Sequence, residues 1–232
     1  MKFFACILIL TGLLFASEKE DLESEIENLT GKRRIEKVIE LAEMIYDEDI
    51  SAAKEYIEIA VEFSENSNEP VLLMKARSVY GDIFFYEGSY RKAGEEYKNS
   101  LKLAEELDDI EYLFDNCKQL GAVFYYLSDY KTASIFYHKA LDIAEVMGDE
   151  VKKAHIFNDL GSIRDEMNDY EKALELYDKA LDVYVKINDE LNIAKVYNNI
   201  ATTLNNKKEP KEAVEYFLKA LEIYQRHGKE NY

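Results

Sequence analysis

Asparagines recur in the second half of the chain at a spacing that could hold a peptide backbone. Asn158 and Asn198 lie 40 residues apart, and Asn199, Asn205 and Asn206 follow closely. A side-chain amide both donates and accepts hydrogen bonds, so repeated asparagines can bind successive peptide units without reading the ligand's sequence. The alternative is that they only solvate a polar surface. Asn158 and Asn198 form the better candidate pair because their spacing recurs throughout the chain.

Aromatic side chains offer a second candidate binding surface. Phe85-Tyr86 and Tyr125-Tyr126 are adjacent pairs at the same 40-residue spacing. Aromatic residues are typical of binding hot spots, although half of such a helical stripe is often buried between helices. The tyrosines are the better candidates for exposure because their hydroxyl groups need water or a polar partner.

The residue types that enzymes use are present but do not form catalytic patterns. His138, His155 and His227 include no i, i+4 pair of the kind that binds a metal ion. Carboxylates are spread along the whole chain, and no G-x-S-x-G, C-x-x-C or H-E-x-x-H motif occurs. The sequence therefore predicts a protein that is not an enzyme and that uses no cofactor or metal.

The elements that must position these residues repeat along the chain. Small residues recur with large apolar ones four and eight positions later, which is typical of one face of a closely packed helix. Five copies at a fixed period predict an all-α fold of five stacked antiparallel helix pairs. A second series, which includes Gly81, Gly121 and Gly161, predicts further close packing between helices. The first series is Ala53, Ala93, Ala133, Ala173 and Ala213.

Polar residues at regular positions predict where the helices begin and end. Side-chain caps are expected at Asp49, Ser89, Asp129 and Asp169, before the second helix of each pair. Gly148 is expected to end a helix. We expect a short capping helix within residues 18–31, followed by a solenoid over 32–232. Its repeats are expected at residues 32–67, 68–107, 108–147, 148–187 and 188–227.

This pattern resembles the tetratricopeptide repeat family. The pairs Tyr80-Gly81, Leu120-Gly121 and Leu160-Gly161 match the signature of its first helix, and the small–aromatic–small series matches its second helix. The aromatic residue that opens the second helix is matched by Tyr90, Tyr130 and Tyr170. The resemblance implies a right-handed α-solenoid whose first helices line a concave groove.

The repeat length differs from that of the usual family member. The common period is about 34 residues, so the longer period here implies roughly one added turn in each helix. This long variety is similar to the repeats of bacterial peptide-sensing regulators and to the sensor regions of some two-component receptors. The resemblance therefore implies binding of a protein or peptide.

The resemblance places the candidate binding residues in the groove, where charges nearly balance. Lys75, Lys118 and Lys195 are offset by several carboxylates, so a basic ligand would be steered into the groove only weakly. Arg164 stands where neighbouring repeats have apolar residues, and it could pack past them, pair with Asp165 or Glu166, or bind a ligand carboxylate. The candidate ligand-binding residues are Tyr86, Lys118, Tyr125, Tyr126, His155, Asn158, Arg164, Lys195, Asn198, Asn199 and Asn205.

The overall charge limits the classes of partner. The chain of 232 residues carries a formal net charge of −18, which disfavours nucleic acid and anionic membrane surfaces. With a near-neutral groove, most of the acidic residues are expected on the solvated outer faces.

The first 17 residues have the pattern of a secretory signal peptide. Met1-Lys2 supplies a positive start, residues 3–16 are almost wholly apolar, and Leu14-Phe15-Ala16-Ser17 offers a cleavage site. An apolar run of this length is too short to span a bilayer. The alternatives are a buried helix and an uncleaved anchor. We expect a periplasmic or secreted protein without membrane insertion after cleavage, or a cytoplasmic one if this segment is not a signal.

Removal of the signal peptide would also remove Cys6 and leave Cys117, which we expect to be buried.

The functional prediction is a non-catalytic module that holds an extended peptide in its groove. One alternative is a structural subunit that forms homo-oligomers through its last helix, where Leu221 and Tyr224 are expected to be uncovered. Another is the input region of a signalling system.

Overall fold

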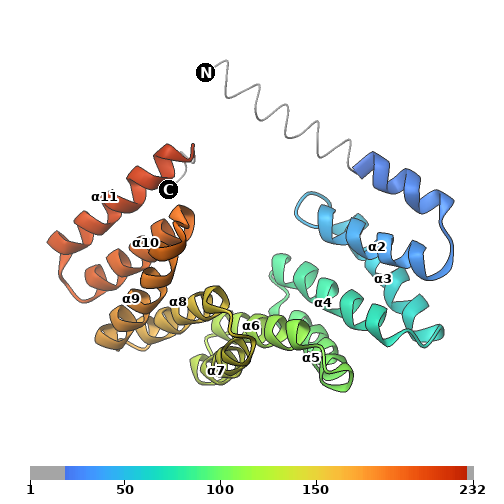
Figure 1. Cartoon of the computed structure of the whole chain (residues 1–232), viewed down its shortest axis with the longest axis horizontal. Coiled ribbons are helices and arrows are strands. Elements are labelled where there is room, and N and C mark those ends of the chain that lie inside the picture. Colours follow the sequence, from blue (N-terminus) through green and yellow to red (C-terminus); the bar gives the residue numbers. More distant parts are fainter. Residues whose placement is uncertain (1–18, 229–232) are drawn as a thin grey trace, which may run out of the picture. The chain divides into compact units, whose positions relative to one another are not determined.

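The computed structural model describes residues 19–228, and every regular element in that range is a helix (Figure 1). The expected signal peptide at residues 1–17 lies outside this range. The chain forms two compact units, Met1–Tyr112 and Leu113–Tyr232, which we describe separately. None of the helices between residues 19 and 228 is both long and apolar enough to cross a lipid bilayer.

The first unit contains two antiparallel helix pairs and an N-terminal helical segment. Residues 19–28 are helical, and Leu22 and Ile26 of this segment are buried against Ile35 and Val38. The same core continues into the following helices, because apolar residues at helical spacing face one another across each pair. The helices are α2 (Gly31–Ile45), α3 (Ile50–Asn66), α4 (Pro70–Tyr86) and α5 (Tyr90–Leu107).

The second unit, from Leu113 onward, continues the same alternation of first and second helices. The first helices α6, α8 and α10 begin 40 residues apart, and each is followed by a second helix of similar length. The bounds are α6 (Ile110–Tyr126), α7 (Tyr130–Met147), α8 (Glu150–Glu166), α9 (Tyr170–Ile187), α10 (Glu190–Asn206) and α11 (Pro210–Arg226).

The expected helix caps are correct at some positions and wrong at others. The carboxylates of Asp49 and Asp129 accept hydrogen bonds of 3.0 and 3.1 Å from backbone N–H groups in the first turns of α3 and α7. Ser89 makes no such cap, because its hydroxyl donates to Glu87 instead. The Asp169 side chain also makes no cap hydrogen bond and pairs with Lys172 at 2.9 Å. Local side-chain competition therefore decides which potential caps form.

The turns between helices depend on left-handed backbone at fixed positions. Gly148 ends α7 with a φ of +68°, as the sequence predicts. A left-handed residue occupies the equivalent place after α5 and α9 even though those residues, Asp108 and Asn188, are not glycine. The turns that follow α4 and α6 contain Gly88 and Ser128 in the same conformation. The fold therefore imposes this conformation whether or not glycine is available.

Three helical glycines allow the two helices of a pair to approach closely. A Cβ atom added to Gly81 would lie 2.5 Å from the nearest ring atom of Tyr97, and one added to Gly161 would lie 2.6 Å from that of Tyr177. Gly121 meets Tyr137 in the same way. The tyrosine rings are almost fully buried. The glycine series therefore provides space for aromatic rings in the core, which confirms the predicted close packing.

The outer face of α11 carries uncovered apolar side chains. Val214, Phe217 and Leu218 are exposed, and 59% of the Leu218 surface is accessible. Leu221 is also exposed, as the sequence predicts, but the prediction for Tyr224 is wrong because that side chain is 7% exposed and packs in a cluster with Ala194. Within the described residues, Tyr224 therefore belongs to the core.

Candidate functional site

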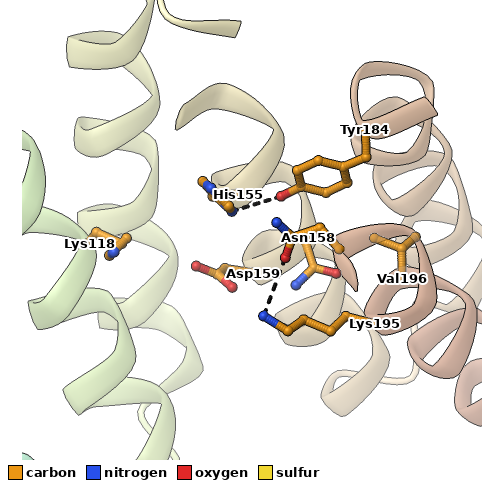
Figure 2. Close-up of a pocket in the computed structure, with 8 residues that line it drawn as sticks. Lys118, His155, Asn158, Asp159, Tyr184, Lys195 and Val196 are labelled. Carbon is orange, nitrogen blue, oxygen red and sulfur yellow. Dashed lines mark hydrogen bonds between the residues drawn. The ribbon is translucent and has the colours of Figure 1, made fainter. Parts of the chain in front are cut away.

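A cavity of about 310 Å³ lies between α6, α8, α9 and α10 in the second unit (Figure 2). Its wall is mainly polar and draws side chains from four helices. These side chains lie on one face of each first helix because residues three, four or seven positions apart share a face. The lining residues are Lys118, His155, Asn158, Asp159, Tyr184, Asn192, Lys195 and Val196.

His155 is held at one side of the cavity by an aromatic partner. Its Nδ1 atom lies 2.8 Å from the hydroxyl oxygen of Tyr184, as Figure 2 shows. Burial lowers the pKa of His155 below its ordinary value, and the charges of Lys118 and Lys195 lower it further. The ring is therefore neutral at neutral pH, and the hydroxyl of Tyr184 fixes its orientation.

A chain of amide hydrogen bonds reaches the acidic group of the cavity. Asn199 donates from Nδ2 to Oδ1 of Asn158 at 2.9 Å, and the Asn158 side chain in turn hydrogen-bonds to Asp159. Burial raises the pKa of Asp159 to about 6, although Lys118, Asn158 and Lys195 all act to lower it. Burial therefore destabilises the ionised form of Asp159, and its three neighbours offset only part of that effect.

Lys195 and Asn192 form the α10 side of the cavity. Lys195 donates from Nζ to Oδ1 of Asn192 at 3.3 Å, and Asn192 donates from Nδ2 to the carboxylate of Asp189 at 2.7 Å. Asp189 also accepts the backbone N–H of Asn192 and so caps α10. The Lys195 side chain is exposed, so its ammonium group is open to a ligand.

A second cavity, of about 270 Å³, lies near the other end of α8 and α10 and is acidic. It is lined by Asp165, Glu166, Asn168, Tyr170 and Asn206. Asn206 donates to Oδ2 of Asp165 at 3.0 Å, and burial raises the pKa of Asp165 above its ordinary value. Within residues 19–228, no three His, Cys, Asp or Glu side chains lie close enough together to bind a metal ion.

Two regions of the second unit match family models of the tetratricopeptide repeat. The matched residues are 115–186 and 194–227. This is a tetratricopeptide repeat protein. The matched residues include all of α8 and most of α6 and α10, so the cavities are formed largely by the first helices of tetratricopeptide repeats.

Solved structures share the fold of the chain at low sequence identity. BtubC (BKLC) from P. vanneervenii has a TM-score of 0.75 and 18% identity, over 95% of this chain and 92% of that one. A signal transduction ATPase with a tetratricopeptide repeat sensor, from Pyrococcus horikoshii, has a TM-score of 0.81 and 18% identity, over 94% of this chain but only 34% of its own.

A third similar structure is a Rap protein complexed with competence and sporulation factor, with a TM-score of 0.68 and 19% identity over 92% of this chain and 60% of that one. A search by sequence among curated proteins finds no match. The structural similarities confirm the predicted all-α solenoid of the tetratricopeptide type.

The tetratricopeptide array brings four of the predicted site residues together. Lys118, His155, Asn158 and Lys195 all line the first cavity, and Asn199 lies directly behind it as the partner of Asn158. The four come from three successive first helices, which is the surface that the resemblance implies.

The remaining candidates lie elsewhere. Tyr86 is in the first unit, where it is exposed and donates to the backbone carbonyl of Asp47 at 3.3 Å. Tyr125 donates to Glu166 at 3.3 Å beside the acidic cavity, and its neighbour Tyr126 is exposed. Two asparagines of α10, Asn198 and Asn205, are exposed and line neither cavity.

Arg164 also lines neither cavity. Its side chain is partly buried, and within the described residues it makes no ion pair with Asp165 or Glu166. Of the three interpretations of Arg164, pairing with these two acids is therefore wrong.

Asn158 is hydrogen-bonded to Asn199, which is the neighbour of Asn198, the asparagine that lies 40 residues after Asn158. The same offset of 41 residues links Asp165 to Asn206 and Tyr125 to Glu166. Residues exactly one repeat apart point in the same direction, whereas contact requires one side chain to be turned toward the other. One residue rotates a side chain by about 100° around the helix axis, which supplies that turn.

Four lining residues were not among the predicted site residues: Asp159, Tyr184, Asn192 and Val196. Tyr184 carried a usable signal, because the equivalent positions in the two preceding second helices are Ala104 and Ala144. A large polar aromatic residue in place of alanine can extend past its own helix into a cavity. Asp159 carried no such signal, since the chain is rich in carboxylates throughout.

Proposed function

We propose that this tetratricopeptide protein is a non-catalytic binding module that holds an extended peptide segment on the surface formed by α6, α8 and α10. The observation that carries the proposal is the arrangement of amides on α8 and α10. Asn158 lines a cavity and is already oriented by Asn199, while Asn198 is exposed on the same helix as Asn199. Side-chain amides held at fixed positions can donate to and accept from the main chain of a ligand.

Two similar structures support this type of function. The ATPase from Pyrococcus horikoshii uses tetratricopeptide repeats as a sensor, and the Rap protein was solved in complex with competence and sporulation factor. Tetratricopeptide arrays of this fold are suited to protein interaction and to sensing. The exposed Tyr126, near Tyr125, adds aromatic surface that could take an apolar side chain of the ligand.

The test is a selection of displayed linear peptides against the purified full chain, followed by calorimetry of a recovered peptide. The double variant Asn158→Ala/Asn198→Ala should weaken binding by about 1–3 kcal/mol, because it removes hydrogen bonds to the ligand backbone. Asn99→Ala, which alters an exposed asparagine on α5, is the matched control and should leave the affinity unchanged. Equal affinity for the wild type and the double variant would contradict the peptide-binding proposal.

We further propose that the protein acts in the periplasm or outside the cell. The segment at residues 1–17 supports this location because it begins with a positive charge and continues as an apolar run. The mass of the mature N-terminus checks it: cleavage after Ala16 or Ser17 is expected, whereas an intact Met1 in a soluble cell fraction would contradict it.

A second candidate function is self-association through α11. Exposed Val214, Phe217, Leu218 and Leu221 form one stripe, whereas Leu181, which is equivalent to Leu221 in the preceding pair, packs into the core. Residues 19–28 already pack on α2 in the first unit, so we do not expect them to cover α11 as well. We therefore expect the exposed stripe of α11 to pack against the same stripe of a second copy. Leu218→Asp should abolish any concentration-dependent dimer in sedimentation equilibrium, with exposed Ile59→Asp on α3 as control. A monomeric wild type would refute this role.

A further inference from the structure

We propose that the cavity between α6, α8 and α10 binds an oxyanion, either a carboxylate or a phosphate-like group, and that Asp159 takes up one proton when the anion binds. This inference goes beyond the proposed peptide site and does not depend on it. Its elements are a cavity of about 310 Å³, two lysines from different helices and one partly buried carboxylate.

The geometry supplies two cations that converge on the same space. Lys118 reaches the cavity from α6 and Lys195 reaches it from α10, with Asp159 of α8 between them in the view of Figure 2. The charges of both lysines act on Asp159 and on His155, so all four side chains share one electrostatic environment. The cavity therefore has an excess of positive charge within a chain whose net charge is −18.

A donor other than the lysines is also present. The Asn192 amide lies beside Lys195 and has a second N–H besides the one that it donates to Asp189. An oxyanion with two or three oxygen atoms can accept from several donors at once, and hydrogen bonds to charged donors are the stronger ones. The lining is therefore better suited to an anion than to a cation or an apolar group.

Asp159 determines how much of this positive charge an anion meets. When Asp159 is ionised, the two lysines and one carboxylate leave a net charge of +1, and when it is protonated they leave +2. Burial raises the pKa of Asp159 to about 6, so the second state is accessible just below neutral pH. An anion that binds between the lysines repels the carboxylate and raises that pKa further, which is the physical basis of the proton uptake.

Other titratable groups around Asp159 do not replace it in this role. Tyr137 of α7 and the tyrosines of α9, Tyr177 and Tyr184, are close enough for Asp159 to raise their pKa values, so all three remain neutral near pH 7. His155 has a lowered pKa, and Asp149 and Asp189 partly oppose that shift. His155 is therefore the one other group of this set that could gain a proton in mild acid.

The alternative is that Asp159 is simply the permanent counter-ion of the two lysines. In that arrangement the carboxylate occupies the place that an external anion would take, and no anion binds. The two arrangements predict different effects of Asp159→Asn. If the cavity is an anion site, the variant binds the anion without taking up a proton. If Asp159 is only a counter-ion, the variant leaves the two lysines without a counter-charge and creates no anion site.

The experiment is isothermal calorimetry on the full chain with two probes that stay ionised from about pH 5 to pH 7, N-acetylglycine for a carboxylate and sulfate for a tetrahedral oxyanion. If the protonated form of Asp159 is the one that binds, affinity should be about tenfold higher at pH 5 than at pH 7. Titrations in buffers of different ionisation enthalpy should show uptake of up to one proton at pH 7. The probe that binds more tightly identifies the carboxylate or the tetrahedral class.

Three variants complete the test. Asp159→Asn should bind at pH 7 as tightly as the wild type does at pH 5 and should lose the pH dependence. Lys118→Gln with Lys195→Gln should abolish binding, whereas Lys131→Gln with Lys211→Gln, which removes the same two charges from exposed sites on α7 and α11, should not. Far-UV circular dichroism checks that each variant is folded.

Two results would overturn the inference. The first is the absence of saturable binding of either probe to the wild type at pH 5, and this result does not depend on any variant folding. The second is a pH dependence that survives in Asp159→Asn, which would assign the proton to His155. Neither result bears on the peptide site, whose test uses Asn158 and Asn198.

Discussion

Replacement of Gly161 by alanine tests whether the close approach of paired helices holds the array together. The added Cβ would lie 2.6 Å from Cε1 and 2.8 Å from Cδ1 of Tyr177, far inside ordinary contact. The ring cannot easily move away, because Tyr177 is 2% exposed and its hydroxyl donates to Ser162. Overpacking of this kind costs about 1–3 kcal/mol.

The substitution also has a favourable effect that must be subtracted. Alanine is about 1 kcal/mol better than glycine within a helix. The free energy of unfolding of Gly161→Ala, measured by urea denaturation with circular dichroism at 222 nm, should therefore fall by up to about 2 kcal/mol relative to wild type.

A second background makes the test decisive. The first helix pair has Leu41 and Ile57 at the equivalent positions, and both are fully buried, so the fold accepts an aliphatic partner there. In a Tyr177→Ile background, Gly161→Ala should become stabilising by up to about 1 kcal/mol, because the clash is gone and the helix propensity remains. If Gly161→Ala is stabilising in the wild type, or equally destabilising in both backgrounds, the close-contact argument is refuted.

Three further predictions concern charge, turns and caps. The raised pKa of Asp159, about 6, means that the native state binds more protons than the unfolded state between roughly pH 4 and 6, so Asp159 lowers stability as pH rises through that range. Asp159→Asn should thus be more stable than wild type at pH 7 by about 3 kcal/mol and equal to it near pH 3.5 in urea titrations. Ser128→Gly should stabilise by about 0.5–1 kcal/mol because Ser128 has a φ of +59°, and Gly88→Ser should have the opposite effect, as seen in thermal melts. Asp129→Ala should lower the urea midpoint more than Asp169→Ala, because Asp129 alone of the two caps its helix; equal losses would contradict that assignment.

The sequence predicts most of the architecture because small residues recur at a fixed period. Alanine and glycine at a fixed period identify the faces where helices meet, and the structure places Tyr97 and Tyr177 against those glycines. Helix ends are less predictable. Ser89 and Asp169 have the residue types of caps, yet Glu87 and Lys172 compete for their side chains, and this competition depends on local geometry.

The sequence predicts several residues of the candidate site but not the hydrogen bonds between them. Lys118, His155, Asn158 and Lys195 are found together because equivalent positions of successive first helices share a surface. Their hydrogen-bond partners follow an offset of 41 residues, which a repeat period cannot reveal because contact depends on the rotation of one helix relative to the next. The role of Asp159 is found only in three dimensions, because it depends on burial in a cavity that Lys118 and Lys195 also line, and residue type does not reveal this.

The amide bridges from α10 to α8 also bear on the elasticity of the array. Asn199 to Asn158 and Asn206 to Asp165 fasten one repeat to the next along the surface where a ligand would lie. A ligand can bind the donor and acceptor atoms of these amides that the bridges leave free, but one that takes over a bridging atom must exchange an old hydrogen bond for a new one. The same exchange loosens the junction between two repeats. Ligand occupancy and local bending stiffness are therefore coupled, and a partner that grips this surface would alter how readily the solenoid flexes at α8 and α10.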